Sequence, residues 1–354
     1  MGGRWDSTSL PVRPGLYMNF VEAAAAQIQG GARGIVGLPL LKYGTAAAGK
    51  FYTVEKVNEA KELFGEENLG PIRLILSGGA KEVLVYTVPA PPKAEPKAEA
   101  AALAYDAVRD AFEARSFNVF VFPGEVSAEE AAATKDWCVR NRNEGKHFLT
   151  VLGGTAADDE NPAAGNTRSS NLKDDYIVNL ITGADVNGTA YSSAQYAPYI
   201  AGLIAGTGIN KSITYTQVSA TDAKKRLKNS EIEAALKAGS LVLVHDGEKV
   251  KVEQGLVTSG KKIRAIRARQ AIATDIPKTA ADSYIGRLDN NADGQAALIA
   301  AVKAYLERLE VNNVLTDIAV GLDPELKSEG DTVYLLISFT EIDSMERIFL
   351  TIKV

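Results

Sequence analysis

The chain has 354 residues, enough for two or three domains with sizeable hydrophobic cores. Its net charge of −5 gives no bulk signal for binding nucleic acid, and its single cysteine, Cys138, excludes an intrachain disulfide. No basic region followed by an apolar core opens the sequence, and the longest apolar run, Ala197–Ala205, is too short to span a bilayer. We therefore expect a soluble protein made in the cytoplasm, without membrane insertion.

The first quarter of the chain predicts an arm, residues 1–21, followed by a small α/β region, residues 22–88. In the arm, apolar residues alternate as in a strand, and the strand residues are Leu16, Tyr17, Met18 and Phe20. In the α/β region we expect strands at Ala32–Leu40, Phe51–Val54 and Glu82–Val88 and helices at Lys56–Phe64 and Pro71–Leu76. The proline-rich residues 89–98 predict a semi-rigid linker.

Residues 99–246 alternate between helical and strand patterns. We expect strands at Phe117–Phe122, His147–Leu152, Tyr176–Thr182, Ile213–Val218 and Leu241–His245. We expect helices at Glu99–Ala114, Ser127–Asn143, Ser193–Ala205 and Thr221–Lys237, with Cys138 buried on the second of them. Strands separated by amphipathic helices predict a parallel sheet with helices on both faces.

Residues 247–345 predict an α+β domain. We expect β structure at Lys249–Thr258, Lys262–Ile266, Val314–Val320 and from Thr332 onward. Helices are expected at Arg267–Tyr284, interrupted or started near Pro277, and at Asp293–Leu309. The second helix has a charged side with Lys303, Glu307 and Arg308.

The C-terminal segment, residues 346–354, has the period-two alternation of a strand. Its apolar residues are Ile348, Phe349, Leu350, Ile352 and Val354. Two interpretations remain open from the pattern. The segment could fold back as the second arm of a hairpin with Thr332–Ile342, or it could pair with a neighbouring chain, because an unpaired strand edge is a template for pairing.

Several stretches resemble chemical motifs but lack a required residue. Near Lys211 a phosphate-binding loop would need glycine where Asn210 stands, and the calcium loop suggested at Asp289 would need an acid where Ala300 stands. An N-cap at Asn291 or Asp293 explains the latter motif better. The helix at 193–205 is like the one that presents the serine of subtilisin-like proteases, but the nucleophile position holds Ala194.

Other candidate groups are equally weak. Ser192 and Ser193 lie next to the nucleophile position, and the two histidines, His147 and His245, have no catalytic or zinc-ligand spacing. We therefore predict no catalytic, cofactor or metal site and no enzymatic activity. A basic run remains with two interpretations, a solvated strand face or a contact with an acidic partner, and consists of Lys261, Lys262, Arg264, Arg267 and Arg269.

Taken together, several stretches resemble the contractile phage tail sheath proteins. The resemblance rests on Pro14–Glu22, Ile28–Val36, Phe117–Gly124, Tyr196–Gly206, Asn210–Thr214, Tyr284–Gly286, Asn290-Asn291 and Asp293-Gly294. It implies a fold of α/β plus α+β type: a degenerate subtilisin-like parallel-sheet domain, a C-terminal sheath domain and extended terminal β arms. Where many relatives carry an extra outward domain, this sequence has the short linker.

The resemblance also implies a function and partners. The terminal arms would pair with sheets of neighbouring subunits, and the helical sheath, made of hexameric rings, would contract around an inner tail tube. The implied partners are the chain itself, the tail tube protein, and the baseplate and tail terminator proteins, with no nucleic acid. The C-terminal domain would lie nearest the tube, which makes Lys303, Glu307 and Arg308 candidate tube contacts. A subtilisin-like hydrolase and a nucleotide-binding α/β enzyme are the alternative functions.

Overall fold

The computed structural model describes residues 33–90 and 105–353, and these form two compact units. The first, here the α/β unit, contains the described residues up to Thr274 together with Asn312–Val314 and the segment from Glu341 onward. The second, here the α10 unit, contains Asp275–Val311 and Leu315–Thr340. The predicted N-terminal strand and most of the proline-rich linker lie outside the described residues.

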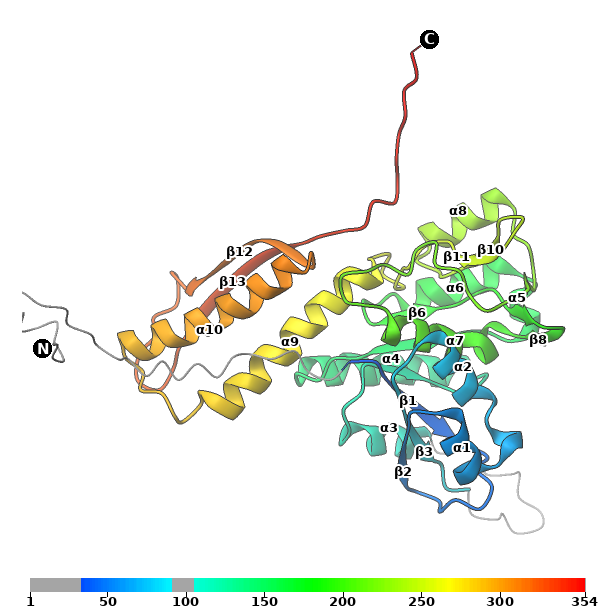
Figure 1. The fold of residues 1–354 in the computed structure, drawn as a ribbon, viewed down its shortest axis with the longest axis horizontal. Helices are drawn as coiled ribbons and strands as arrows, with labels where there is room; N and C mark the ends of the chain where they lie inside the picture. The colour runs from blue at the N-terminus through cyan, green and yellow to red at the C-terminus, as the bar shows by residue number, and fades with distance from the viewer. Residues whose placement is uncertain (1–32, 91–104, 354) are drawn as a thin grey trace, which may run out of the picture. The chain divides into compact units, whose positions relative to one another are not determined.

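A six-stranded sheet forms the centre of the α/β unit (Figure 1), in the order β2-β3-β1-β4-β5-β6. The strands are β1 (Ile35–Leu40), β2 (Phe51–Val54), β3 (Glu82–Thr87), β4 (Val119–Val121), β5 (Leu149–Leu152) and β6 (Ile177–Asn179). Every pair is parallel except β2 with β3, as the alternating helices and strands predicted. Strands from both sides of the proline-rich linker therefore belong to one sheet.

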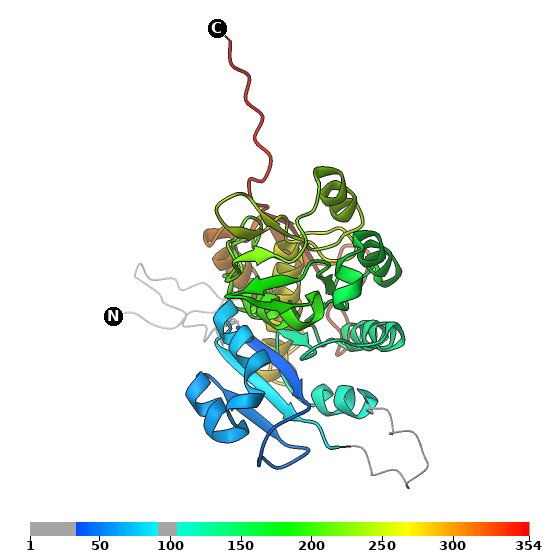
Figure 2. The same cartoon turned by 90° about the vertical axis from the view of Figure 1, so that its right-hand side faces the viewer.

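Helices cover both faces of this sheet, and each face has its own core (Figure 2). Along β4, Val119 and Val121 face one core while Phe120 faces the other, because side chains alternate along a strand. The first core contains residues of α1 (Val57–Phe64), α2 (Gly70–Gly78) and α7 (Ser193–Gly206). The second contains residues of α3 (Tyr105–Glu113), α4 (Ala128–Asn143) and α6 (Pro162–Leu172).

The helices α2 and α7 pack unusually closely because glycines line their contact. A Cβ on Gly202 would lie 2.0 Å from the carbonyl oxygen of Ile75, and one on Gly78 would lie 2.3 Å from that of Tyr199. Such distances leave no room for any side chain. The glycines of the Tyr196–Gly206 stretch therefore set the position of α7 over the sheet.

We expect Gly202→Ala to lower the free energy of unfolding by about 1–3 kcal/mol, because the added methyl group forces α7 away from α2. Urea unfolding followed by circular dichroism measures the change. Gly70→Ala is the matched control, since a Cβ there meets nothing within 4 Å, and it should leave stability nearly unchanged. Equal stability of the two variants would contradict this packing.

Two predictions in the second half of the α/β unit are wrong. Ile213–Val218 forms no strand, only a single bridge between Gln217 and Lys251, because Tyr215 has a φ of +59° that breaks the extended backbone. The expected helix from Thr221 begins only at α8 (Asn229–Lys237), because Asp222–Ala223 is recruited as strand β9. Tertiary pairing overrides helix propensity in that stretch.

Small sheets complete the unit. A three-stranded sheet consists of β7 (Ala184–Val186), β8 (Thr189–Tyr191) and β9. A two-stranded sheet consists of β10 (Leu243–His245) and β11 (Val250–Val252), so that only part of the predicted β segment at 249–258 is a strand.

The predicted β segment at Lys262–Ile266 is wrong, because it begins a helix, α9 (Ile263–Ser283). Ile263 and Ile266 are buried at a spacing of three residues, which a helix also satisfies. The helix continues through Pro277, and the border between the two units crosses it at Thr274–Asp275.

The α10 unit pairs one long helix with a two-stranded sheet (Figure 1). The helix is α10 (Ala292–Val311), and the strands are β12 (Leu315–Leu322) and β13 (Leu335–Glu341), whose last residue belongs to the α/β unit. Asn291 caps α10, since its side-chain oxygen accepts a hydrogen bond from the Gly294 N–H at 2.9 Å. The predicted N-cap is therefore confirmed, and the apolar stripe of α10 buries Val302, Tyr305, Leu306 and Leu309.

Candidate functional site

The segment after Glu346 pairs with no strand among the described residues. The hairpin interpretation is therefore wrong: β13 pairs with β12, and the residues from Ile342 to Lys353 have no strand partner. The side chains of Ile348, Phe349, Leu350 and Ile352 are 67%, 90%, 83% and 83% exposed. In Figure 1 the segment runs as an extended trace away from the six-stranded sheet. Val354 lies outside the described residues.

Glu346, by contrast, is held firmly at the start of this segment. Its side chain is only 9% exposed, and its carboxylate forms an ion pair with the Lys262 ammonium. Oε2 also accepts a hydrogen bond from Gln254 at 2.7 Å, and Oε1 accepts one from Thr214 at 2.8 Å and one from Ser344 at 3.0 Å. The Ser212 hydroxyl lies farther away, at 3.5 Å from Oε1. We call the cluster of Glu346 and its four nearer donors the Glu346 clamp.

The basic run at 261–269 is mostly neutralised inside the chain. Lys261 pairs with Asp175, Lys262 with Glu346 and Arg269 with Glu341. Arg264 donates a hydrogen bond to the backbone carbonyl of Asn313 at 2.8 Å. The interpretation as a solvated strand face is therefore wrong, because most of the run lies on α9 and serves contacts within the α/β unit.

The first turn of α7, where a subtilisin-like nucleophile would stand, is closed. Ala194 is buried, and its N–H donates to the carbonyl of Gly154, just after β5. The Ser193 hydroxyl, also buried, accepts a hydrogen bond from the Gly154 N–H at 2.7 Å. A Cβ on Gly153 would lie 2.3 Å from the Ala194 nitrogen, so the helix sits directly on this loop. No space is left there for a substrate carbonyl.

Ser192 and the two histidines also have other partners. Ser192 caps α7 by accepting from the Gln195 N–H, and its hydroxyl lies 3.2 Å from Glu125 Oε1. His147 Nδ1 lies 2.8 Å from the Tyr176 hydroxyl, and burial lowers the pKa of this histidine. His245 Nδ1 accepts a hydrogen bond from the Gly247 N–H at 3.0 Å. Within the described residues, neither histidine hydrogen-bonds to a serine.

No metal or redox chemistry is suggested by the described residues. They contain no cluster of three or more histidine, cysteine or acidic side chains placed to hold a metal ion. Cys138 is buried as predicted, and burial raises its pKa to about 12, so the thiol stays protonated. In the same part of the chain, no helix is long and apolar enough to cross a membrane.

One buried carboxylate beside α7 lacks full pairing. Asp159, at the end of α5 (Ala156–Asp159), accepts a hydrogen bond from the Ser193 N–H at 2.6 Å, while its second oxygen has no hydrogen-bond partner. Burial raises the pKa of Asp159 to about 6, against 3.8 for the ordinary group. The folded protein therefore binds a proton at this site more tightly than the unfolded chain does.

A carboxyl whose pKa is higher in the folded protein than in the unfolded chain stabilises the fold at pH values below its unfolded-chain pKa. This contribution is lost as the pH rises through its folded-state pKa. We therefore expect Asp159→Asn, which cannot ionise, to become more stable relative to the original protein as the pH rises from 4.5 to 7.5. Urea midpoints of both proteins at the two pH values measure this difference. The same difference at both pH values would contradict the ionisation argument.

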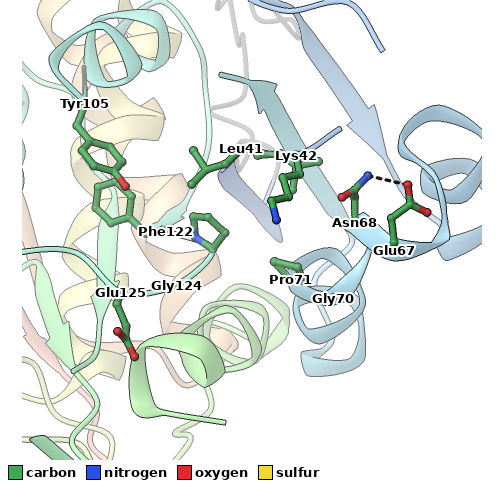
Figure 3. Close-up of a pocket in the computed structure, with 12 residues that line it drawn as sticks. Leu41, Lys42, Glu67, Asn68, Gly70, Pro71, Tyr105, Phe122, Gly124 and Glu125 are labelled. Carbon is green, nitrogen blue, oxygen red and sulfur yellow. Dashed lines mark hydrogen bonds between the residues drawn. The ribbon is translucent and has the colours of Figure 1, made fainter. Parts of the chain in front are cut away.

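A cavity of about 350 Å³ lies at the carboxyl ends of β1 and β4 (Figure 3), where ligands bind in many open α/β sheets. The rings of Tyr105 and Phe122 line one side, Gly70 and Pro71 line the other, and the Lys42 ammonium points into the space between them. None of the described lining residues is a serine, cysteine or histidine. The described lining therefore offers no Ser–His or Cys–His pair of the kind that acyl-transferring hydrolases use.

The candidate tube contacts lie on the side of α10 that faces solvent. The Lys303 ammonium lies 3.9 Å from the Glu307 carboxylate, and both side chains are about half exposed, at 55% and 51%. The Arg308 guanidinium lies 6.0 Å from the ring centre of Tyr305. All three side chains are exposed and therefore accessible to a partner.

Sequence reasoning missed the Glu346 clamp. Its residues are separated by up to 132 positions, and each looks like an ordinary surface residue in the sequence. One signal was available: Glu346 is the only acidic residue after Asp343, and it stands at the point where the apolar alternation begins.

Models of two protein families match the chain. The model described as the phage tail sheath protein central domain matches residues 98–258, and that described as the phage tail sheath C-terminal domain matches residues 258–354. The chain belongs to the phage tail sheath protein family. Tail sheath proteins are structural, so the chain is a structural protein and not an enzyme. The tail sheath protein of Clostridium phage phiCD119 is 24% identical over 234 residues, which cover 63% of this chain and 61% of that protein.

Solved tail sheath structures share the fold. The sheath tail protein from Desulfitobacterium hafniense superposes with a TM-score of 0.72 at 20% identity, covering 92% of this chain and all of that one. The helical sheath of the anti-feeding prophage in its contracted state gives a TM-score of 0.72 at 15% identity, covering 97% and 99% of the two chains. The contracted sheath of the extracellular contractile injection system PVC gives 0.72 at 10% identity, with 98% of both chains covered.

Proposed function

We propose that this protein is the subunit of a contractile sheath that polymerises helically around an inner tail tube and contracts to drive the tube through a target cell envelope. Its membership in the tail sheath family supports the first part of this proposal. The observation that carries it furthest in this chain is the apolar segment after Glu346, whose side chains are exposed and whose backbone has no strand partner. Such a segment is suited to pairing with a second copy.

Strand donation fits the chemistry of this segment. An added strand gains main-chain hydrogen bonds for affinity, while its alternating side chains fix the register. The apolar residues Ile348, Leu350 and Ile352 fall on one face of such a strand. When each copy donates its arm to the next one, the contact is heterologous and need not close, which generates a helical polymer. The N-terminal residues Leu16, Tyr17, Met18 and Phe20 are proposed as a second donated arm.

The sheet β12–β13 of a neighbouring copy is the best candidate to accept an arm. It has only two strands, and an unpaired strand edge is a template for pairing with another chain. The seven residues of β13 match the seven that follow Arg347. Outward-facing apolar side chains on this sheet, Leu322 at 42% and Leu336 at 51% exposure, would be covered by the new strand.

The remaining features of the proposal follow from the family resemblance. The subunits would form hexameric rings that stack into the sheath, with the tail tube, baseplate and terminator proteins as partners. Assembly would take place in the cytoplasm of a bacterial host, and the product would be a virion tail or a released tail-like particle. The position of α7 over the sheet, with its closed first turn, supports a degenerate subtilisin-like domain at residues 99–246. Contraction would be a switch between two packings of nearly rigid subunits.

We expect a chain that ends at Met345 to stay folded and monomeric, while the full chain forms tubes or sheath fragments. The truncation removes about half a dozen main-chain hydrogen bonds per contact, each worth roughly 0.5–1.5 kcal/mol. It also removes the burial of four apolar side chains, at roughly 1.5–3 kcal/mol each. Together these terms are comparable to a whole micromolar association of about 8 kcal/mol.

Light scattering and electron microscopy of both chains measure assembly, and thermal melting measures folding. A truncated chain that still assembles would contradict arm donation. Because this truncation also removes Glu346 and its contacts, a chain that ends at Arg347 is melted alongside it. A large drop in the melting temperature of the chain ending at Arg347 would also contradict arm donation, because it would mean that the arm stabilises its own monomer.

We also propose that the solvent-facing side of α10 contacts the tail tube. Reversing both charges in Lys303→Glu with Arg308→Glu should weaken assembly of sheath on tube in a salt-dependent way, because exposed charge pairs are screened by salt. Co-sedimentation with purified tube at low and high salt measures this effect. The control reverses two exposed charges elsewhere in the α10 unit, Arg287→Glu with Lys327→Glu. Normal extended tails from the first double variant would rule out this surface.

A further inference from the structure

The Glu346 clamp stands at the boundary between the ordered α/β unit and the exposed arm. Its donors come from three separate segments: the loop after α7 (Thr214), the stretch from β11 to α9 (Gln254 and Lys262) and the turn before the arm (Ser344). After Glu346, the described side chains of the arm are exposed. The clamp is therefore the last point at which the chain is attached to its own unit.

We propose that the Glu346 clamp is a positioning device, which fixes the root of the C-terminal arm to the α/β unit so that a second copy of this chain captures the arm in one direction and register. This inference rests on the proposed function, because it assigns a role to one residue in arm donation. Glu346 is a positioning residue in this scheme, since the arm and not the carboxylate contacts the neighbour.

The burial and hydrogen bonding of Glu346 distinguish the clamp from an ordinary surface ion pair. A carboxylate that is 9% exposed has lost most of its hydration, and it needs several hydrogen bonds and an opposite charge to compensate. The donor Thr214 is itself fixed, because its hydroxyl also accepts a hydrogen bond from the Gly255 N–H at 3.0 Å. The next residue, Tyr215, holds a left-handed φ of +59° that is uncommon for a bulky side chain.

This arrangement does not serve the core of the α/β unit. Glu346 has no apolar side chain beside it in sequence except the exposed Met345, and the side chains of the arm beyond it are exposed in the part of the chain that the structure describes. A buried charge with a strained neighbouring loop has a clear use if the direction of the arm matters. Backbone strain of this kind persists where contacts with the surrounding structure hold the local conformation in place, often at functional sites.

The clamp also shortens the free part of the chain. The preceding backbone tether is the hydrogen bond from the Ile342 N–H to the Val314 carbonyl, at 3.1 Å. Without the clamp, residues 343–346 would join the free arm and its root would move back to that tether. A longer tether lowers the effective concentration of the arm at its acceptor, by roughly twofold for four added residues.

The test uses Glu346→Gln, which keeps the shape of the side chain and removes its charge. Nitroxide labels on Arg347→Cys and on Thr351→Cys report the motion of the arm near its root and near its end. Cys138 does not compete for the label, because it is buried and its pKa is raised to about 12. In the monomer, we expect the label at 347 to be restricted only when Glu346 is present, and the label at 351 to be mobile in both proteins.

Assembly is measured on the same full-length chains without labels. We expect Glu346→Gln to raise the critical concentration for sheath assembly by roughly twofold or more. The melting temperature of the same variant measures how much of the change comes from loss of monomer stability. Arg347→Ala, which changes the next residue but leaves the clamp intact, is the matched control and should assemble normally. Gln254→Leu removes one hydrogen-bond donor of the clamp and should raise the critical concentration by a smaller factor. This variant provides the test if Glu346→Gln folds poorly.

The outcomes separate the clamp from arm donation itself. If the chain ending at Met345 fails to assemble while Glu346→Gln and Gln254→Leu assemble like the original protein, the clamp has no positioning role and this inference is wrong. If the label at 347 is equally mobile with and without Glu346, the inference is also wrong. If the chain ending at Met345 assembles normally, the proposed function fails, and this inference fails with it.

Discussion

The unpaired backbone of the C-terminal arm is the constraint on which this account depends. Main-chain N–H and C=O groups in an extended segment are satisfied by water or by another strand, and apolar side chains beside them favour the strand. Among the described residues of the monomer, the arm has neither a strand partner nor a core to cover its side chains. The arm and its proposed acceptor also belong to different units, since the arm begins in the α/β unit and β12–β13 lies largely in the α10 unit. Both units are therefore needed for one link of a polymer.

The closed first turn of α7 fits a parallel sheet that serves a purely structural role. Catalysis requires an exposed nucleophile beside a base and an open space for the substrate. In this chain the first turn of α7 is closed by packing: Ala194 is buried, and the Ser193 hydroxyl bonds to the loop after β5. Close packing at Gly78 and Gly202 makes the same region rigid. A rigid body suits a subunit that changes its packing with neighbours more than its own fold.

Sequence patterns predicted the parallel sheet and the helices on both of its faces, because burial imposes strong periodicity on strands such as Val119–Val121 and on helices such as α10. The errors fell where tertiary context decided the outcome. Tyr215 takes a left-handed conformation, Asp222–Ala223 is recruited as an edge strand, and Ile263–Ile266 fits a helix as well as a strand. The arm was visible as an alternation, but its root was not, because the Glu346 clamp is assembled from side chains far apart in the sequence.

Hydrogen–deuterium exchange of the arm in the monomer and in the assembled sheath tests the central claim most directly. The amides of residues 347–353 should exchange within seconds in the monomer, because no other described segment of the chain pairs with them, and they should be strongly protected in the polymer. The same comparison on β1 and β4 provides the internal reference, since these buried strands are paired in both states. Protection of the arm already in the monomer, or rapid exchange of the arm in the assembled sheath, would contradict strand donation as the basis of this protein's assembly.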